Sequence, residues 1–521
     1  MSGPPIAAAR GSRGGVGLPW GSHTAVLLLL AAAACEPAGD RDEIRGTTVT
    51  MAYYERGLYP DEDMPAKFLT FLSLTTLDEE GELEGRLARR WEHSSDFREW
   101  TYHLRTDVRW HDGVPVSAHD IAFSVDLWER VSHYYTSFIE SAMALDDSTV
   151  AIRYTSSADE SIMSYLTYYP KHILSALDPD EFYEWDFWTH PVGNGPYRFV
   201  RHMPQTMIEF AANPDFFAGE PRIQRVVLKF VGEGGLTELL SGNVDAVTWT
   251  NPAGIPKFAT DPRFRVYYSP ESYRGYAIYW RNDHPLFEDP AVRRALTFAI
   301  DRREILRALN LPENTPIVDG PFTERQLRRG ALPEPLPFDT GQARAILDAA
   351  GWLDRDGDTV RERDGMMFRF TALVASRGGD ETAILLQEHL RRIGVRMDLQ
   401  PLDQGNFRER VRTGAFEAAF GQFDNSPGSL GAIRLGRGAP LGYESAEVVG
   451  LVERAAETAD SEVRGRIYSR LAGILQADMP ITFLSPRVNV VFAHRRLQGL
   501  RSPWRVDPAW YMEELWLEDG R

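Results

Sequence analysis

The feature that most constrains this chain is the alternation of strand-like and helix-like segments along most of its length. Residues 100–110 alternate apolar and polar side chains as a strand does, and Asp-Gly at 112–113 supplies a tight turn. A helix is expected next, because Ser117 can cap its start and Ile121 and Val125 fall on one helical face. Such alternation favours an α/β fold.

The clearest helical pattern covers residues 288–309. Asp289 is expected to cap the start, with Pro290 in the first turn, and Asp301 looks like a second cap. Two helices should therefore meet near Ile300–Asp301. Further along, Gly351 and Gly394 each follow a helical pattern and are expected to end a helix.

The chain has one cysteine, Cys35, directly after a short apolar stretch at 25–34. A single cysteine cannot form an internal disulfide, and ten apolar residues are too few to span a bilayer. With Arg10 and Arg13 as a basic leader, the layout indicates a secretory signal. It resembles the lipobox of bacterial lipoproteins, although Ala32 stands where that motif usually has Leu. We expect residues 1–34 to be a signal peptide, 35–43 a tether, and Cys35 the lipid attachment point that anchors the chain to a membrane.

Length and charge narrow the classes of function. At 521 residues the chain exceeds one ordinary domain, which suggests two or three lobes. Its formal net charge of −18 makes it a poor candidate for nucleic-acid binding. The hydrophobic content of 43% is enough for a large packed core.

Eight segments occur in an order that resembles bacterial extracellular solute-binding proteins of family 5, which serve ABC importers of peptides and nickel chelates. The resemblance runs from about residue 83 to the C-terminus. The segments lie at 87–124, 191–200, 213–231, 240–247, 286–306, 343–352, 389–399 and 441–455.

The resemblance implies an α/β, two-lobed periplasmic-binding-protein fold of type II, with a hinge of two strands and an additional domain on the first lobe. The hinge is placed near residues 277–281 and 480–485. The expected domains are lobe I at 44–80, 191–278 and 485–521, the additional domain at 81–190, and lobe II at 279–484.

The resemblance also points to residues that would hold a peptide. Burying a peptide ammonium requires an anion beside it, and Asp424 in "AAFGQFDNS" matches the Asp that supplies this anion in peptide-binding members. The peptide carboxylate suits a bidentate donor, and Arg377 in "LVASRGGD" falls where dipeptide-binding relatives place one. Each residue has an alternative role, Asp424 in a turn and Arg377 in a solvated loop. Gln422 departs from the family, which often has Trp there.

Aromatic residues supply candidate apolar walls for a ligand cleft. Tyr276 and Trp280 fall near the expected hinge, and Trp249 ends a segment expected to be a strand. Packing in the core is the alternative for each of them.

The acidic stretch at Asp354, Asp356 and Asp358 has the spacing that begins an EF-hand loop. The glycine of that loop is displaced to Gly357, and Gly365 stands where the bidentate Glu should be. We therefore expect a solvated hairpin rather than a metal site.

The leading function is a non-enzymatic receptor in the periplasm or on the outer face of the cytoplasmic membrane. It would capture a short peptide or similar small solute as a monomer, without a cofactor, and deliver it to ABC permease subunits. Their ATPase partners would supply the energy, because this chain has no G-x-x-x-x-G-K-[ST] loop. A nickel chelate, an opine, an oligosaccharide or haem remain alternative ligands. A secreted hydrolase is a remote alternative, since neither G-x-S-x-G nor H-E-x-x-H occurs.

Overall fold

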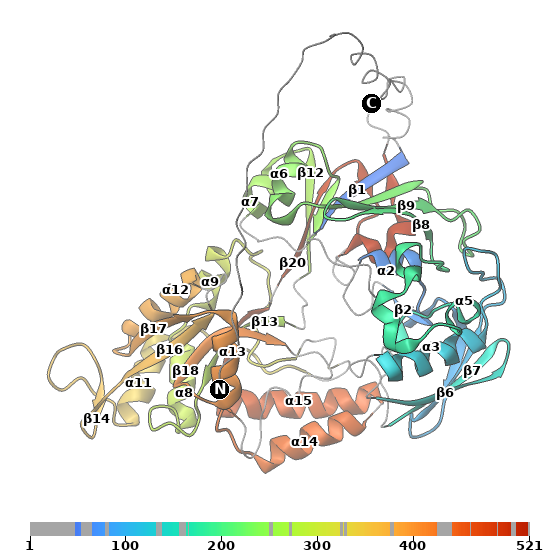
Figure 1. The fold of residues 1–521 in the computed structure, drawn as a ribbon. Coiled ribbons are helices and arrows are strands. Elements are labelled where there is room, and N and C mark those ends of the chain that lie inside the picture. Colours follow the sequence, from blue (N-terminus) through green and yellow to red (C-terminus); the bar gives the residue numbers. More distant parts are fainter. Residues whose placement is uncertain are drawn as a thin grey trace, which may run out of the picture. The chain divides into compact units, whose positions relative to one another are not determined.

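Three main sheets organise the part of the chain that the computed structural model describes (Figure 1). The signal peptide and tether expected from the sequence, including Cys35, lie outside the described residues. The described residues are 47–53, 65–78, 83–131, 138–155, 163–164, 166–248, 254–269, 274–322, 327, 331–375, 380–424, 440–458, 460–486, 488–501 and 507–518.

The first sheet has seven strands in the order β12-β20-β11-β1-β10-β9-β8. Strand β1 runs parallel to both of its neighbours, β10 and β11. The short helix α2 (Pro65–Thr70) and the 3-10 segment η7 (Pro508–Glu514) share a core with one face of this sheet, and α6 (Gly235–Leu240) and α7 (Ile255–Thr260) share a core with the other. The strand bounds are β1 Thr48–Tyr53, β8 Tyr197–Met203, β9 Met207–Ala212, β10 Arg225–Phe230, β11 Ala246–Thr248, β12 Phe264–Ser269 and β20 Asn489–His494.

The second sheet has four antiparallel strands in the order β4-β5-β7-β6. Helix α3 (Ala118–Val131) packs on it over a core rich in buried aromatic rings, among them Trp100 and Trp110. One half of the capping box expected at Ser117 is present, since its backbone N–H donates to Oδ2 of Asp120 at 2.8 Å and its hydroxyl donates to the same oxygen at 3.1 Å. The strand bounds are β4 Ala88–His93, β5 Glu99–Leu104, β6 Ile139–Asp146 and β7 Thr149–Tyr154.

The third sheet has five strands in the order β17-β16-β18-β13-β19, and helices cover both of its faces. Alternate residues of β13 face opposite ways, so that Ile278 joins the core under one helix layer and Ala277 the core under the other. The strand bounds are β13 Arg274–Trp280, β16 Arg369–Ala375, β17 Arg396–Leu402, β18 Ala418–Asp424 and β19 Ile481–Pro486. The first layer contains α8 Pro290–Phe298, α9 Arg302–Ala308, α11 Thr340–Ala349 and α12 Asp380–Arg391, and the second contains α13 Gln404–Thr413, α14 Ala446–Glu457 and α15 Ser461–Asp478.

The expected helix boundary at 300–301 is confirmed. Oδ1 of Asp289 accepts from the backbone N–H of Ala291 at 2.8 Å, and Oδ1 of Asp301 accepts from that of Glu304 at 2.9 Å. Each aspartate therefore satisfies a donor at the start of its own helix, α8 or α9.

The chain passes from the seven-stranded to the five-stranded sheet earlier than the sequence suggested, and it returns later than the sequence suggested. The change falls between the end of β12 at Ser269 and the start of β13 at Arg274, and again between β19 and β20. The expected hinge segments, 277–281 and 480–485, instead lie mostly within β13 and β19. Strands β13 and β19 are paired neighbours in the five-stranded sheet. The sequence did not predict this, because the alternation of apolar residues does not reveal which sheet a strand belongs to.

None of the helices in the described part of the chain combines the length and the apolarity that crossing a bilayer requires.

Candidate ligand-binding site

Strands β16 and β18 end at one edge of the five-stranded sheet, and the two charged candidates stand at or shortly after these ends in the sequence. The strands are parallel neighbours, with Val374 paired to Phe420, so their carboxyl ends point the same way. Asp424 is the last residue of β18, and Arg377 follows two residues after the end of β16. Ligands of open α/β sheets bind outside the carboxyl ends of such strands. Arg377 itself, and the side chain of Asp424, lie outside the described part of the structure.

Tyr276 lies at the same edge, on the neighbouring strand β13. The antiparallel register pairs Arg274 with Asp424 and Tyr276 with Gln422. The Tyr276 ring is half-buried and stacks on Phe420, with ring centroids 6.1 Å apart and planes at 26°. Tyr276 is therefore the predicted aromatic wall residue that the structure places beside the strand end at Asp424.

Sequence reasoning missed a polar group beside Tyr276. Tyr276 also pairs with Ser485 of β19, and the register of this ladder shifts between Tyr276 and Ala277. The Ser485 hydroxyl is buried, and its Oγ has no hydrogen-bond partner among the described residues. A buried hydroxyl without a partner costs about 1–3 kcal/mol, so Ser485 is a candidate contact for a polar ligand group. A serine inside an apolar strand carries no sequence pattern that could have singled it out.

Trp280 is a core residue in this structure, in contrast to the cleft wall expected from the sequence. Its side chain has 0% exposure, and its indole N–H donates to Oγ1 of Thr482 at 2.9 Å. The ring also packs against Phe287, with centroids 5.0 Å apart. Trp280 shares this core with residues of helices α8, α11 and α12, so it is not part of the candidate ligand site.

The seven-stranded sheet contributes a second edge of the same kind. Its parallel strands β1 and β11 end at Tyr53 and Thr248, and Trp249 follows Thr248 directly but lies outside the described residues. At this edge the hydroxyl of Tyr53 donates to Oδ1 of Asp507 at 2.6 Å. Oδ1 of Asp507 also accepts from the backbone N–H of Ala509, which caps η7.

The Tyr53–Asp507 pair is a polar pair in a buried setting. Asp507 is 7% exposed, and burial raises the pKa of its carboxyl from 3.8 to about 6. The two hydrogen bonds act in the opposite direction and lower that pKa. Sequence reasoning had no signal for this pair, because the residues are 454 positions apart.

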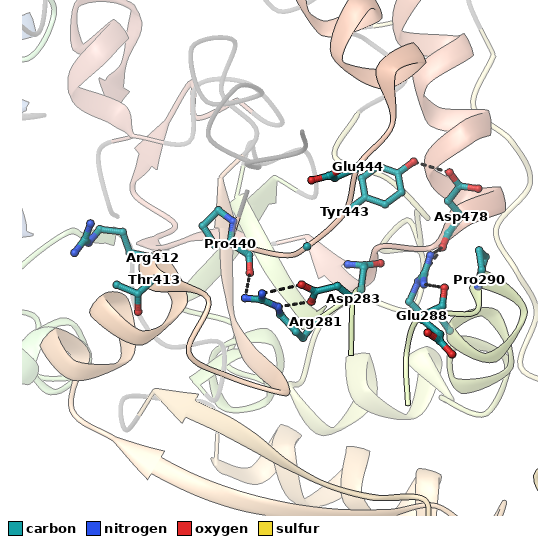
Figure 2. Close-up of a pocket in the computed structure, with 13 residues that line it drawn as sticks. Arg281, Asp283, Glu288, Pro290, Arg412, Thr413, Pro440, Tyr443, Glu444 and Asp478 are labelled. Atoms are coloured by element: carbon teal, nitrogen blue, oxygen red, sulfur yellow. Dashed lines mark hydrogen bonds and ion pairs between the residues drawn. The ribbon is translucent and has the colours of Figure 1, made fainter. Parts of the chain in front are cut away.

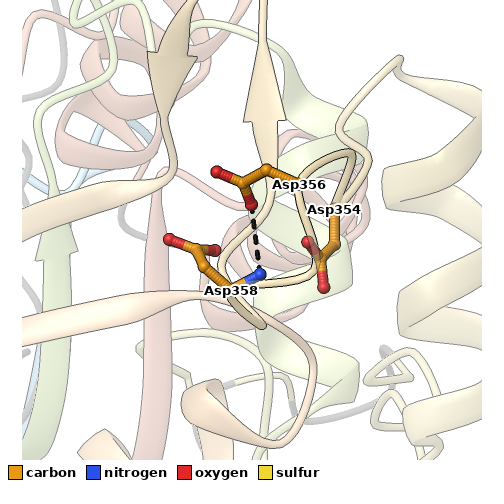
Figure 3. Close-up of side chains that lie close together, drawn as sticks. All are labelled: Asp354, Asp356 and Asp358. Carbon is orange, nitrogen blue, oxygen red and sulfur yellow. Dashed lines mark hydrogen bonds between the residues drawn. The ribbon is translucent and has the colours of Figure 1, made fainter.

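The acidic loop brings Asp354, Asp356 and Asp358 together, with carboxylate oxygens within 4.8 Å of one another (Figure 3). All three side chains are exposed, and their oxygens accept backbone N–H groups inside the loop, including that of Asp358 at 3.1 Å. These bonds account for the aspartates as turn residues. Within the described residues, this is the one set of three or more His, Cys, Asp or Glu side chains close enough to share a metal ion.

The chain passes twice between the seven-stranded and five-stranded sheets, as expected for a two-lobed α/β protein. Residues 82–431 match the family model described as bacterial extracellular solute-binding proteins, family 5 Middle. The chain belongs to this family, as its motifs indicated.

Individual relatives agree with this assignment. The chain is 24% identical over 500 residues to the oligopeptide-binding protein AppA of Bacillus subtilis (strain 168), covering 88% of this chain and 89% of that protein. The structure of CtaP, an ABC transporter substrate-binding protein of Listeria monocytogenes, matches with a TM-score of 0.76 at 21% identity, covering 91% of this chain and 99% of that one. NikA of Brucella suis in complex with Fe(III)-EDTA also gives 0.76, at 18% identity, covering 90% and 100%. These matches confirm the two-lobed α/β fold.

Proposed function

We propose that the protein is the substrate-binding component of an ABC importer and captures short peptides outside the cytoplasmic membrane. The observation that supports this most is the shared edge where β16 leads to Arg377 and β18 ends at Asp424. A free peptide carries an ammonium and a carboxylate, and Asp424 at the end of β18 and Arg377, two residues after β16 in the sequence, would offer a partner for each. The family membership and the likeness to an oligopeptide-binding protein point the same way.

The mechanism is a shift of population between open and closed arrangements of the two lobes. A ligand that contacts both lobes only when they are closed stabilises the closed state by that difference in binding free energy. The permease would recognise the closed, loaded form, and its ATPase subunits would supply the energy. The ligand is bound and released unchanged, so no catalytic residue is assigned.

The attachment to the membrane is a separate part of the proposal. A lipid on Cys35 would hold a monomeric receptor in the periplasm or on the outer face of the cytoplasmic membrane. In cell fractionation, the wild-type chain should sediment with membranes and Cys35→Ser should appear in the soluble fraction. Equal distribution of the two chains would remove the anchor from the proposal and leave the receptor function untouched.

The direct test is to identify what the protein carries. The secreted chain with Cys35→Ser is purified and denatured, and the released small molecules are identified by mass spectrometry. Ligand present at 1,000 times its Kd stabilises the fold by about 4 kcal/mol, so adding the identified ligand should raise the Tm. Released short peptides support the proposal. If the released molecule is a nickel chelate, an opine, an oligosaccharide or haem, the receptor function stands but the roles assigned to Asp424 and Arg377 do not. Chemical turnover of the added ligand would contradict the non-enzymatic function.

A further inference from the structure

A polar pocket lies within the part of the structure built on the five-stranded sheet, at the end of β13 opposite to Arg274 (Figure 2). Its volume is about 630 Å³, a size that suits small-molecule sites. The segment after β13, the last turn of α13, the chain at 440–444 and the end of α15 line it. We refer to it as the Asn282 pocket, after the residue on which the inference depends.

The Asn282 pocket is distinct from the proposed peptide site. Asp424 pairs with Arg274 at one end of β13, whereas the pocket begins at Arg281, directly after the other end of that strand. At ~3.3 Å per residue, a seven-residue strand separates the two places by about 20 Å. A ligand in the pocket therefore does not overlap the peptide site.

The wall of the pocket is held by a network around Arg281. Nη1 of Arg281 donates to the backbone oxygens of Gly414 at 2.7 Å and Pro440 at 3.0 Å, and Nη2 donates to Oδ2 of Asp283 at 2.8 Å. Gly414 and Gly442 both have positive φ, and a Cβ at either position would collide with Arg281 or Asp283 respectively. The close approach of three chain segments thus depends on glycine at these two positions.

The buried Arg293 does not offer an anion site in this pocket. It is 2% exposed, and its guanidinium donates to four backbone carbonyls, those of Phe287, Glu288, Asp478 and Met479. Arg281 is likewise committed to Asp283 and to two carbonyls. The two arginines fix the main chain around the pocket instead of facing a ligand.

Asn282 gives the pocket a buried hydrogen-bond acceptor, whereas the third arginine of the lining, Arg412, is exposed and pairs with Glu409. Asn282 is 7% exposed, and its Nδ2 donates to the carbonyls of Trp280 at 2.9 Å, Leu441 at 3.2 Å and Pro480 at 3.4 Å. Three carbonyl partners fix the orientation of the amide, because only the NH2 group can donate. Its Oδ1 is buried and has no partner in the described part of the chain.

Carboxylates add negative charge beside this free acceptor. Glu444 is exposed on the pocket wall and forms no ion pair with another described residue. Glu288, 61% exposed, forms a long ion pair of 3.8 Å with Arg363, so its charge is partly compensated. A ligand that carries several N–H donors and positive charge would complement a buried amide oxygen with carboxylates nearby.

We propose that the Asn282 pocket binds a small organic cation with a primary ammonium or guanidinium group. The cation would donate to Oδ1 of Asn282 and to the carboxylate of Glu444. Asn282 itself is a poor site for a test substitution, because its Nδ2 joins three chain segments. Glu444 is exposed, so substitutions there should leave the fold intact.

The test is isothermal titration calorimetry with agmatine, which carries both cationic groups, on the secreted Cys35→Ser chain. Binding should weaken roughly tenfold in Glu444→Gln, the effect of losing one charge-assisted hydrogen bond. Glu444→Arg should abolish it. The control Glu453→Gln, on the exposed face of α14, should bind as the parent does, and Asp424→Asn is included to detect agmatine that binds in the proposed peptide site instead.

Four results would overturn the inference. One is the absence of binding at millimolar agmatine, and another is unchanged binding in Glu444→Arg. The third is an equal loss in Glu453→Gln, which would indicate non-specific attraction to an acidic protein. Loss confined to Asp424→Asn would place agmatine in the peptide site and likewise contradict the pocket, without affecting the proposed transport function.

Discussion

The hydroxyl of Tyr53 donates a 2.6 Å hydrogen bond to Oδ1 of Asp507, and so joins the end of β1 to the start of η7. Burial raises the pKa of Asp507 from 3.8 to about 6, because its charged form loses hydration. At a pH between the pKa of the unfolded state and the raised pKa of the folded state, such a carboxyl takes up a proton when the protein folds. This pair therefore makes the stability of the protein depend on pH.

Asp507→Asn should remove that dependence. Below about pH 4 the Asp507 carboxyl is protonated in both states, and between about pH 4 and pH 6 only the unfolded state ionises. The folded state then binds more protons, so the free energy of unfolding falls as the pH rises, by up to ~3 kcal/mol, and stays lowered above about pH 6. Urea unfolding at pH 4.5 and pH 7 measures this loss. The loss should be smaller in the variant, and equal losses in both proteins would contradict the assignment.

Arg302 and Asp319 form a buried ion pair that holds strand β19 of the five-stranded sheet. Their side chains are 3% and 0% exposed, and Nη1 of Arg302 also donates to the backbone oxygen of Phe483 at 3.2 Å. Removing one partner leaves the other charge buried, so Arg302→Ala should lower the free energy of unfolding by about 3–5 kcal/mol. The matched control is Arg307→Ala on the same helix, whose side chain is 62% exposed and 3.7 Å from Asp301, and it should change stability by less than about 1 kcal/mol. Similar losses in the two variants would be inconsistent with a special role for the buried pair.

Local signals in the sequence predicted where several helices begin and end. Asp289 and Asp301 cap their helices as expected, and Gly351 and Gly394 have φ of 82° and 81° at the helix ends. Each of these features depends on a few neighbouring residues, so a single sequence carries the whole signal. The family motifs then supplied the two-lobed fold that local patterns do not specify.

Features that depend on long-range packing could not be predicted. Tyr276 and Trp280 lie on the same face of β13, because they are four residues apart in a strand. The apolar alternation predicts that both side chains lie on that face. It does not predict how far the covering helices extend along the strand, and of these two residues only Trp280 is fully buried beneath them. The buried oxygens of Ser485 and Asn282, which lack a hydrogen-bond partner among the described residues, depend in the same way on segments that are distant in sequence.

The different burial of these two aromatic residues predicts different effects of substitution. Trp280→Phe should lower the free energy of unfolding by roughly 1–3 kcal/mol, because it opens a small cavity and removes the bond to Thr482. It should leave ligand affinity unchanged. Tyr276→Ala should instead weaken the binding of the ligand identified by mass spectrometry, with a smaller effect on stability. Calorimetry and urea unfolding separate the two properties, and a loss of affinity in Trp280→Phe would return Trp280 to the site.

Calcium should have no effect on thermal stability through the acidic loop. The oxygens of Asp354, Asp356 and Asp358 already accept backbone N–H groups, and Gly365 offers no side chain at the position where an EF-hand has its bidentate Glu. The Tm should therefore be the same in EDTA and in millimolar calcium. A calcium-dependent rise that Asp356→Asn abolishes would show that the loop is a metal site.

Asp424 and Arg377 should act on opposite ends of a bound peptide, since the strands leading to them end at one sheet edge. Losing a charge-assisted partner costs about 1.5–3 kcal/mol, so Asp424→Asn should weaken binding of a peptide with a free N-terminus at least roughly tenfold. The same variant should bind an N-acetylated peptide as well as the parent does, because that peptide brings no ammonium. Arg377→Lys keeps the charge but loses the bidentate geometry, and it should weaken only peptides with a free C-terminal carboxylate. Equal losses for free and blocked peptides, measured by calorimetry, would mean that these residues support the fold of the edge rather than bind the peptide termini.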